Sequence, residues 1–511
     1  MKGKKIVSTL LALLLLANLP VSALAAEWDI GNGDITVNAG SGGQTVTQGS
    51  QVDVPDSAPV ITGSSTENTV TINAEKDQTA SVTLSGANID GSNTVKAAVS
   101  TTGEGNVSIE LNGDSTLKSG KGHAGLEKKN GGKLTIADED KNGKLTAEGG
   151  KYGAGIGGGD QGAGSGITIT GGEIKATGGQ YGAGIGGGKG DGSDITISGG
   201  EVNATGGTSG AGIGGGYNGN GSDITITGGE VNATGGKYGA GIGGGEYGIG
   251  KDIIITGGEV NATGGRFSAG IGGGSRGTGS DITISGGEVN ASGGVNGAGI
   301  GGGLRSKGKD ITVSGDTKLK VQGGDEDHYD GAGAGIGDGG SNAYGTKILG
   351  AEVEPDTSGL TTNGSIAYYA PGADMETDKP TSTTVGASSQ PEKPTDPGAE
   401  RGADAPLYRV TDQDGKDIAH KAERKDGVLT VTVDADFAIL TGKLSSIDTL
   451  KRQGIEKIVF VTNKAASTFQ AADLLEKGAS SDAYSLTHDG ATVTFVVSEK
   501  KTDVSGILIQ P

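Results

Sequence analysis

The stretch from Ile224 to Gly245 reads ITITGGEVNATGGKYGAGIGGG, and it is one copy of a unit that recurs along the chain. The isoleucine of its GAGIGGG segment returns every 28 or 29 residues. A period of about 20–50 residues is typical of stacked repeats. Strict copies occupy residues 149–315, and their isoleucines are Ile156, Ile185, Ile213, Ile242, Ile271 and Ile300, followed by a looser copy at Ile336.

Each copy contains three short apolar runs that are separated by paired glycines. Ile224 and Ile226 alternate with threonines, Val231 and Ala233 alternate with polar residues, and the run at Ile242 alternates with glycines. Alternation at period two predicts strands, and the glycine pairs predict turns. We therefore predict an all-β chain whose main part is a parallel β-helix, right-handed by the usual rule, with three strands in each rung of about 29 residues.

Stacking explains how such a sparse unit becomes stable. Equivalent strands of successive rungs pair about 4.8 Å apart, so Ile, Val and Ala form inward rows and the polar residues form outward rows. One rung cannot bury its apolar face alone, and stability comes from its neighbours. We expect the two ends to carry caps that hide the open strand edges.

The first 26 residues have the pattern of a secretory signal peptide. Lysines open the chain, an apolar core follows at Ile6–Leu19, and Ala23-Leu24-Ala25-Ala26 offers small-residue cleavage sites after Ala25 and after Ala26. We expect the mature protein to be secreted and extracellular, with association with the cell wall as a further option. The apolar core is too short to span a bilayer, so we expect no membrane insertion.

The rest of the chain divides by composition. We expect an N-terminal cap with irregular rungs at 27–148, the glycine-rich repeats with a closing cap at 149–370, a proline-rich linker at 371–405 and a small α+β domain at 406–511. In that domain we expect helices at Ser446–Gln453 and Thr468–Lys477, and strands at Gly427–Leu440, Ile455–Thr462, Tyr484–Leu486 and Ala491–Val497.

Charge and cysteine content limit the partners. The chain of 511 residues has a formal net charge of −20 and no cysteine, and loss of three lysines with residues 1–26 makes the charge −23. Such an acidic exterior disfavours nucleic acid and anionic membranes, which are bound through Lys and Arg. We expect a monomer without disulfides.

A row of aromatic residues is the first candidate site. Four residues before the repeated isoleucines stand Tyr152, Tyr181, Ser209, Tyr238, Phe267 and Asn296, and Tyr217 and Tyr247 lie in loops just beyond the same strand. Stacking of the rungs places these positions in a line, with adjacent positions one rung, or about 4.8 Å, apart. The rings either stack on sugar residues of a polysaccharide or stack on one another and shield the turn. The candidate carbohydrate-binding residues are Tyr152, Tyr181, Tyr238 and Phe267.

Two acidic rows form the second candidate. Stacked carboxylates repel one another unless a cation or hydrogen bonds relieve them, and calcium suits oxygen ligands on turns. The alternative is that each Asp caps a turn and each Glu is solvated, so we assign no metal ligand and keep Ca²⁺ as an option. The rows are Asp194, Asp223, Asp252, Asp281 and Asp310, and Glu173, Glu201, Glu230, Glu259 and Glu288.

Catalysis has little support in the sequence. The strict repeats contain no histidine, and identical repeats argue against one unique site. The two irregular polar clusters are Lys121–Lys133, with His123, and Asp325–Asp330, with His328. We therefore assign no catalytic residue.

The copies ITISGGEVNATGG at Ile195–Gly207 and GAGIGGG at Gly210–Gly216 carry a family resemblance. They resemble glycine-rich β-helix repeats of secreted and cell-surface proteins of Firmicutes. They are also similar to polysaccharide-lyase-like, non-catalytic carbohydrate-binding domains of clostridia. The resemblance covers roughly residues 100–345, and it implies a carbohydrate ligand with calcium as an option.

These observations lead to one functional expectation with two alternatives. We expect a non-catalytic extracellular β-helix protein that binds polysaccharide, or a cell-surface glycan in adhesion, through repeated weak contacts along the row. The first alternative is a structural spacer that displays the C-terminal domain. The second is an atypical polysaccharide lyase.

Overall fold

The structure, a computed structural model, describes residues 25–343, 346–386, 408–413, 418, 420–425, 427–452, 455–475, 482–489, 492–497 and 500–502. The chain forms two compact units, Met1–Ala387 and Ser388–Pro511. Most of the predicted signal peptide (residues 1–24) and residues 387–405 of the predicted linker lie outside the described residues. Within the described part of the chain, no helix has both the length and the apolar character that a membrane crossing requires.

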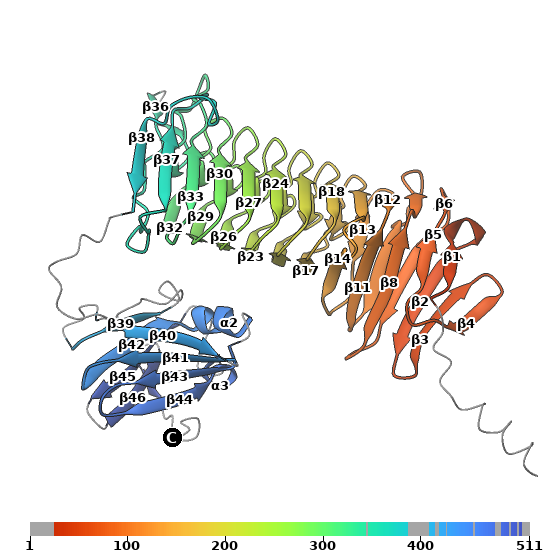
Figure 1. Cartoon of the computed structure of the whole chain (residues 1–511). Helices are drawn as coiled ribbons and strands as arrows, with labels where there is room; N and C mark the ends of the chain where they lie inside the picture. The colour runs from red at the N-terminus through yellow and green to blue at the C-terminus, as the bar shows by residue number, and fades with distance from the viewer. Residues whose placement is uncertain are drawn as a thin grey trace, which may run out of the picture. The chain divides into compact units, whose positions relative to one another are not determined.

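The first unit is the predicted parallel β-solenoid, built from three long sheets (Figure 1). In the repeats each rung contributes one strand to each sheet, and each strand pairs with its equivalent in the next rung. Sheet A contains β1 (Glu27–Asp29), β5 (Val60–Thr62), β8 (Thr79–Ser85), β11 (Asn106–Asn112), β14 (Leu134–Ala137), β17 (Gly164–Ile169), β20 (Gly192–Ile197), β23 (Gly221–Ile226), β26 (Gly250–Ile255), β29 (Gly279–Ile284) and β32 (Gly308–Val313).

Sheets B and C complete the solenoid. Sheet B contains β4 (Gln51–Pro55), β3 (Gly43–Gln48), β2 (Ile35–Gly40), β7 (Val70–Ala74), β10 (Val99–Gly103), β13 (Leu126–Lys128), β16 (Ile156–Gly157), β19 (Ile185–Gly186), β22 (Ile213–Gly214), β25 (Ile242–Gly243), β28 (Ile271–Gly272), β31 (Ile300–Gly301) and β34 (Ile336–Gly337). Sheet C contains β6 (Ser64–Ser65), β9 (Asn88–Asp90), β12 (Asp114–Lys118), β15 (Lys144–Glu148), β18 (Glu173–Thr177), β21 (Glu201–Thr205), β24 (Glu230–Thr234), β27 (Glu259–Thr263), β30 (Glu288–Ser292), β33 (Lys318–Gln322), β37 (Ser365–Tyr369) and β38 (Ser382–Val385).

The register places identical residues over one another, as the repeat predicts. Ile224 pairs with Ile253 in sheet A, and Ile242 pairs with Ile271 in sheet B. These isoleucines are completely buried, and the core of the repeats consists of Ile, Val and Ala. The thin inward set is sufficient because every rung is covered on both sides by a rung of the same shape.

Both ends of the solenoid are closed by antiparallel strands. At the N-terminal end β3 pairs antiparallel with β2, and β4 with β3. At the C-terminal end β38 pairs antiparallel with β37, and β35 (Ser341–Ala343) and β36 (Thr346–Ile348) form a separate hairpin. These strands hide edges that would otherwise offer unpaired backbone groups to other chains.

The start of the linker was predicted wrongly. Residues 371–386 continue the solenoid: Thr381 N–H bonds the carbonyl of Tyr368, and Gly386 N–H bonds the carbonyl of Gly364. The proline-rich composition indicated an extended chain, but Pro371 and Pro380 flank the turn that leads into β38. An extended segment becomes a strand when an open sheet edge lies beside it, and composition does not show that edge.

The described residues of the second unit form two sheets and two helices, in agreement with the α+β expectation. One sheet has β39 (Arg409–Thr411), β42 (Phe437–Lys443), β45 (Ala483–Asp489), β46 (Thr492–Val497) and β47 (Lys500–Thr502). The other has β40 (His420–Lys425), β41 (Val428–Val433), β43 (Lys457–Val461) and β44 (Ala466–Gln470). The helices are α2 (Leu444–Arg452) and α3 (Ala471–Leu475).

The helix predicted at Thr468–Lys477 is partly wrong. Its first residues belong to β44, which pairs antiparallel with β43, and only Ala471–Leu475 is helical among the described residues. The phenyl ring of Phe469 is buried in the core and lies 5.9 Å from the ring of Phe495. Pairing with β43 therefore decides the local structure over the weak helical pattern.

Candidate functional site

Two loops in each rung form the candidate site. The first loop (GGKYG in residues 235–239) connects sheet C to sheet B, and the second (GGGEYG in residues 243–248) leaves sheet B for sheet A. The second loop of one rung bonds to the first loop of the preceding rung: Tyr217 N–H donates to the carbonyl of Tyr181 at 2.8 Å, and Ser275 N–H to that of Tyr238 at 2.9 Å. The two loop columns are thereby joined into one continuous surface, which we call the ridge.

The predicted aromatic residues lie on the ridge in two stacked pairs. The rings of Tyr152 and Tyr181 are 5.3 Å apart and 13° from parallel, and those of Tyr238 and Phe267 are 5.9 Å apart and 12° from parallel. The rung spacing brings each pair into contact, as predicted, and the faces within a pair cover each other. Of the two interpretations, stacking of the rings on one another is the one that the structure shows. All four residues are partly exposed.

Tyr217 and Tyr247 extend the first stacked pair along the ridge. Ser209 takes the place of the ring in that rung, is buried, and donates a hydrogen bond of 2.7 Å to Glu246 Oε2. The ring of Tyr217 lies edge-on to Tyr181 at 5.5 Å, and that of Tyr247 lies edge-on to Tyr217 at 6.2 Å. The aromatic surface therefore continues past the position where the row itself is interrupted.

Cationic side chains cover the aromatic rings. The ammonium groups of Lys121, Lys151 and Lys189 lie 5.7, 5.3 and 5.5 Å from the ring centroid of Tyr152. None of these three lysines has a carboxylate partner within the described residues. Further along the ridge, Lys237 lies over Tyr238 at 5.0 Å, Arg266 over Phe267 at 4.9 Å and Arg276 over Tyr247 at 5.9 Å.

The ridge ends at the rung of Arg305, because the charge of this side chain is neutralised by Asp330. Arg305 forms two hydrogen bonds with Asp330, Nε to Oδ1 at 2.9 Å and Nη2 to Oδ2 at 3.0 Å. This pairing with Asp330 raises the pKa of Arg305. In the same rung the ring is replaced by the buried Asn296, whose Nδ2 donates to the carbonyls of Asp330 and Gly331. The predicted cluster at Asp325–Asp330 therefore closes the ridge.

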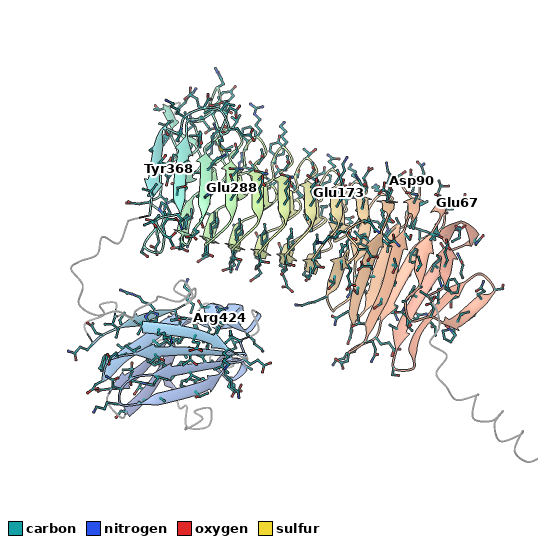
Figure 2. All side chains as sticks on the ribbon, in the orientation of Figure 1. Glu67, Asp90, Glu173, Glu288, Tyr368 and Arg424 are labelled. Carbon is teal, nitrogen blue, oxygen red and sulfur yellow. The ribbon has the colours of Figure 1, made fainter. Side chains whose placement is uncertain are left out.

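The outer face of sheet C has the opposite charge. The glutamate row lies there in register, and Figure 2 shows Glu173 and Glu288 on this sheet. Beside it runs a ladder of asparagines in which each Nδ2 donates to the Oδ1 of the preceding rung, at 3.1, 2.9 and 2.7 Å. The ladder comprises Asn203, Asn232, Asn261 and Asn290.

The aspartate row lies inside the strands of sheet A, at bulge positions that the pairing skips. Its members have φ between 50° and 54°, and the equivalent residue of the first strict rung is Gly166, with φ 68°. Asp is tolerated in this left-handed region more readily than most residues, which explains its recurrence. Burial raises the pKa of Asp252, the charges of Asp223 and Asp281 raise it further, and Lys251 opposes them. The described residues hold no group of three His, Cys, Asp or Glu arranged to bind a metal ion.

The cluster around His123 is a compact ion network. The carboxylate of Glu127 is buried, His123 Nδ1 lies 2.8 Å from its Oε2, and Lys129 Nζ lies 3.0 Å from the same oxygen. Glu127 pairs with Gly157 in sheet B and fills space beside Gly159. The network therefore seals the junction between the irregular rungs and the strict repeats.

Sequence reasoning did not assign the cations and the asparagine ladder. For part of the cations a signal was present, because Lys151, Lys237 and Arg266 each directly precede an aromatic residue of the row. The others come from the second loop, whose contact with the first loop is tertiary. The ladder could have been found from the recurrence of Asn in every strict copy after Asn203.

Comparison with known proteins supports the repeat architecture. The family model described as the beta helix repeat matches residues 141–160, 167–189, 195–217, 224–246, 253–275 and 282–304. These stretches are the strict rungs and the residues just before them, so the chain contains beta helix repeats. No curated protein and no solved structure matches the chain.

Proposed function

We propose that this is an extracellular, non-catalytic protein that binds an acidic polysaccharide along the ridge. One observation carries the proposal: Lys121, Lys151 and Lys189, without carboxylate partners among the described residues, surround one stacked pair of tyrosines. Three ammonium groups gather within 5.7 Å of one ring centroid in a chain with a net charge of −20. A ligand with carboxylate or sulfate groups would provide the missing partners.

The arrangement suits a polymer. From Lys121 to Arg266 the ridge spans five rung steps, or about 24 Å, and the rung spacing is comparable with the length of one sugar in an extended chain. Because the ring faces within each pair are covered, recognition would rely mainly on the cations beside the rings. The glutamate row on sheet C would repel an acidic polymer and so favour the ridge. Each exposed charge contact contributes about 0.2–1 kcal/mol, so affinity would depend on several contacts made together.

The test compares two polymers that differ in charge alone: polygalacturonate and its methyl ester, in buffer with chelator. The full chain should bind the charged polymer, and binding should weaken as salt rises. Replacement of Lys121, Lys151 and Lys189 by Gln should raise Kd about 3- to 150-fold, corresponding to about 0.6–3 kcal/mol.

A matched control removes the same charge elsewhere. Lys175, Lys318 and Lys320 lie on the outer face of sheet C, and their replacement by Gln should leave Kd within about twofold. Equal binding of the methyl ester would overturn the acidic ligand class. Failure to bind either polymer would overturn this ligand class and favour the spacer alternative.

A further inference from the structure

Asp56 is a buried carboxylate at the N-terminal end of the solenoid, just after β4. Its side chain is 1 % exposed. Oδ2 accepts hydrogen bonds from Trp28 Nε1 at 2.8 Å and from the backbone N–H of Ala26 at 3.2 Å, and Oδ1 accepts from Ala58 N–H at 3.1 Å. All three donors are neutral, and no cationic side chain of the described residues pairs with Asp56.

A buried charge without a counter-ion is unfavourable, and buried Asp is usually paired. One of the three donors has an unusual place in the sequence. Ala26 follows directly after one of the two predicted cleavage sites, so hydrolysis of the Ala25–Ala26 bond would leave its nitrogen as an α-ammonium. The new cation would then stand at the position from which the amide already bonds Asp56.

We propose that the chain is processed between Ala25 and Ala26 and that the new α-ammonium forms an ion pair with the buried carboxylate of Asp56. A processing peptidase adds water across the peptide bond. Ala25 leaves as a carboxylate, and the Ala26 nitrogen takes up protons and becomes the ammonium. The ion pair anchors the first strand of the mature protein in its cap.

The backbone distinguishes the two cleavage sites. The carbonyl of Ala26 accepts a hydrogen bond of 2.9 Å from Val60 N–H, which continues the parallel pairing of β1 with β5. Cleavage after Ala26 would remove this bond together with the donor to Asp56. Cleavage after Ala25 keeps both interactions and strengthens one of them.

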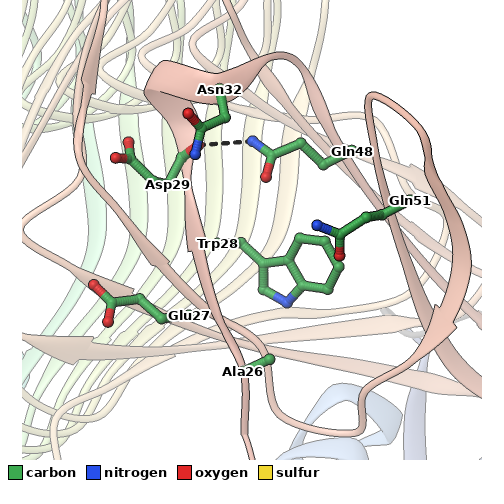
Figure 3. A pocket seen from close by; sticks show the side chains of 7 residues that line it. All are labelled: Ala26, Glu27, Trp28, Asp29, Asn32, Gln48 and Gln51. Atoms are coloured by element: carbon green, nitrogen blue, oxygen red, sulfur yellow. Dashed lines mark hydrogen bonds between the residues drawn. The ribbon is translucent and has the colours of Figure 1, made fainter.

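The surroundings have room for an ammonium. Ala26 and Trp28 line an open pocket of about 270 Å³ with Glu27, Asp29, Asn32, Gln48 and Gln51 (Figure 3). On one side, Gln48 Nε2 donates to the carbonyl of Asp29 at 2.7 Å. An ammonium at Ala26 therefore keeps contact with water while one of its N–H groups donates a hydrogen bond to Asp56.

The first experiment determines the N-terminus of the protein exported by a bacterial host with residues 1–25 intact. Intact mass and N-terminal sequencing should show Ala26 as the first residue. A mature protein that begins at Glu27, or a chain that keeps Ala25, would overturn the cleavage site.

The second experiment tests the ion pair in full chains that run to Pro511. A chain that begins at Ala26 is compared with one that begins at Ala25, in which the Ala26 nitrogen stays an amide; both are released from a removable fusion. The Ala26 chain should melt about 2 °C or more higher, followed by Trp28 fluorescence. Asp56→Asn should abolish the difference. Equal melting temperatures in the unsubstituted pair, or a difference that persists in Asp56→Asn, would overturn the ion pair.

A pH series keeps the test decisive even if Asp56→Asn does not fold. An ion pair raises the pKa of the α-amino group in the folded state above its ordinary value of about 8. The advantage of the Ala26 chain should therefore be complete below about pH 7 and should vanish as pH rises through the higher folded value. An advantage that is unchanged between pH 7 and about pH 11 would refute the ion pair.

Discussion

Substitution of one repeat glycine tests whether backbone contact between rungs holds the solenoid together. Gly243 has φ 129°, and a Cβ built on it would lie 2.1 Å from the carbonyl oxygen of Gly272 in the next rung. A residue with a side chain in this backbone region costs about 1–3 kcal/mol. The overlap is with backbone, which cannot rotate away, and forced repacking adds about 1–3 kcal/mol. Gly243→Ala should therefore reduce the free energy of unfolding by about 2–6 kcal/mol.

Gly42→Ala is the matched control. Gly42 lies in the turn between β2 and β3, and a Cβ there would meet no atom within 4 Å. Its substitution should leave stability unchanged or raise it by about 0.4–1 kcal/mol, because alanine restricts the unfolded chain.

Urea unfolding of the full chain measures both variants. Far-UV circular dichroism follows the strands, and the single tryptophan, Trp28, follows the cap. With a slope of about 1–3 kcal/mol/M, the Gly243→Ala midpoint should fall by about 0.7 M or more. Equal midpoints for the two variants would refute the argument that close glycine contact between rungs determines stability.

Three further perturbations follow from the structure. Asn261→Ala removes one hydrogen bond donated to Asn232 and one accepted from Asn290, and should lower the free energy of unfolding, measured in urea, by about 1–2 kcal/mol. Thr263 is exposed, and Thr263→Ala should change the free energy of unfolding by less than about 0.5 kcal/mol. Because the folded-state pKa of Asp252 is raised, ionisation of its carboxyl group destabilises the folded protein as pH rises through that pKa. Asp252→Asn should therefore raise the melting temperature slightly at pH 7. A lower melting temperature of this variant in calcium buffer would instead indicate a metal site. Burial lowers the pKa of His488 to about 4 from 6.5. The second unit should therefore lose up to about 3 kcal/mol of stability as pH falls from 6.5 to about 4. This loss should appear in circular dichroism but not in Trp28 fluorescence, and His488→Asn should reduce the dependence of stability on pH.

The candidate site was only partly readable from the sequence. The aromatic row and its spacing follow from counting, because residues one period apart must stack in a solenoid. Whether the rings present their faces to a ligand or to one another depends on side-chain direction, which counting does not provide. Lys189 reaches the ring of Tyr152 from the second loop of the next rung, so the two residues meet only once the rungs have stacked.

The role of Asp56 was also outside sequence reasoning. Nothing in the residues around it distinguishes it from other acidic residues in turns. Its burial and its contact with Ala26, thirty residues earlier, exist only once the first strand pairs with β5. The same pairing separates two cleavage sites that look alike in the sequence.

By itself the sequence determined the class of fold, the length of a rung and the residues that form its core. A period of 28 or 29 residues with alternating apolar runs leaves only a stacked solenoid able to bury those side chains. Only the tertiary structure decided where the solenoid ends, which charges remain unpaired and how the rings of the aromatic row are arranged. Local pattern controls local conformation, whereas edge pairing, burial of charge and contact between loops depend on residues that are distant in the chain and become neighbours only on folding.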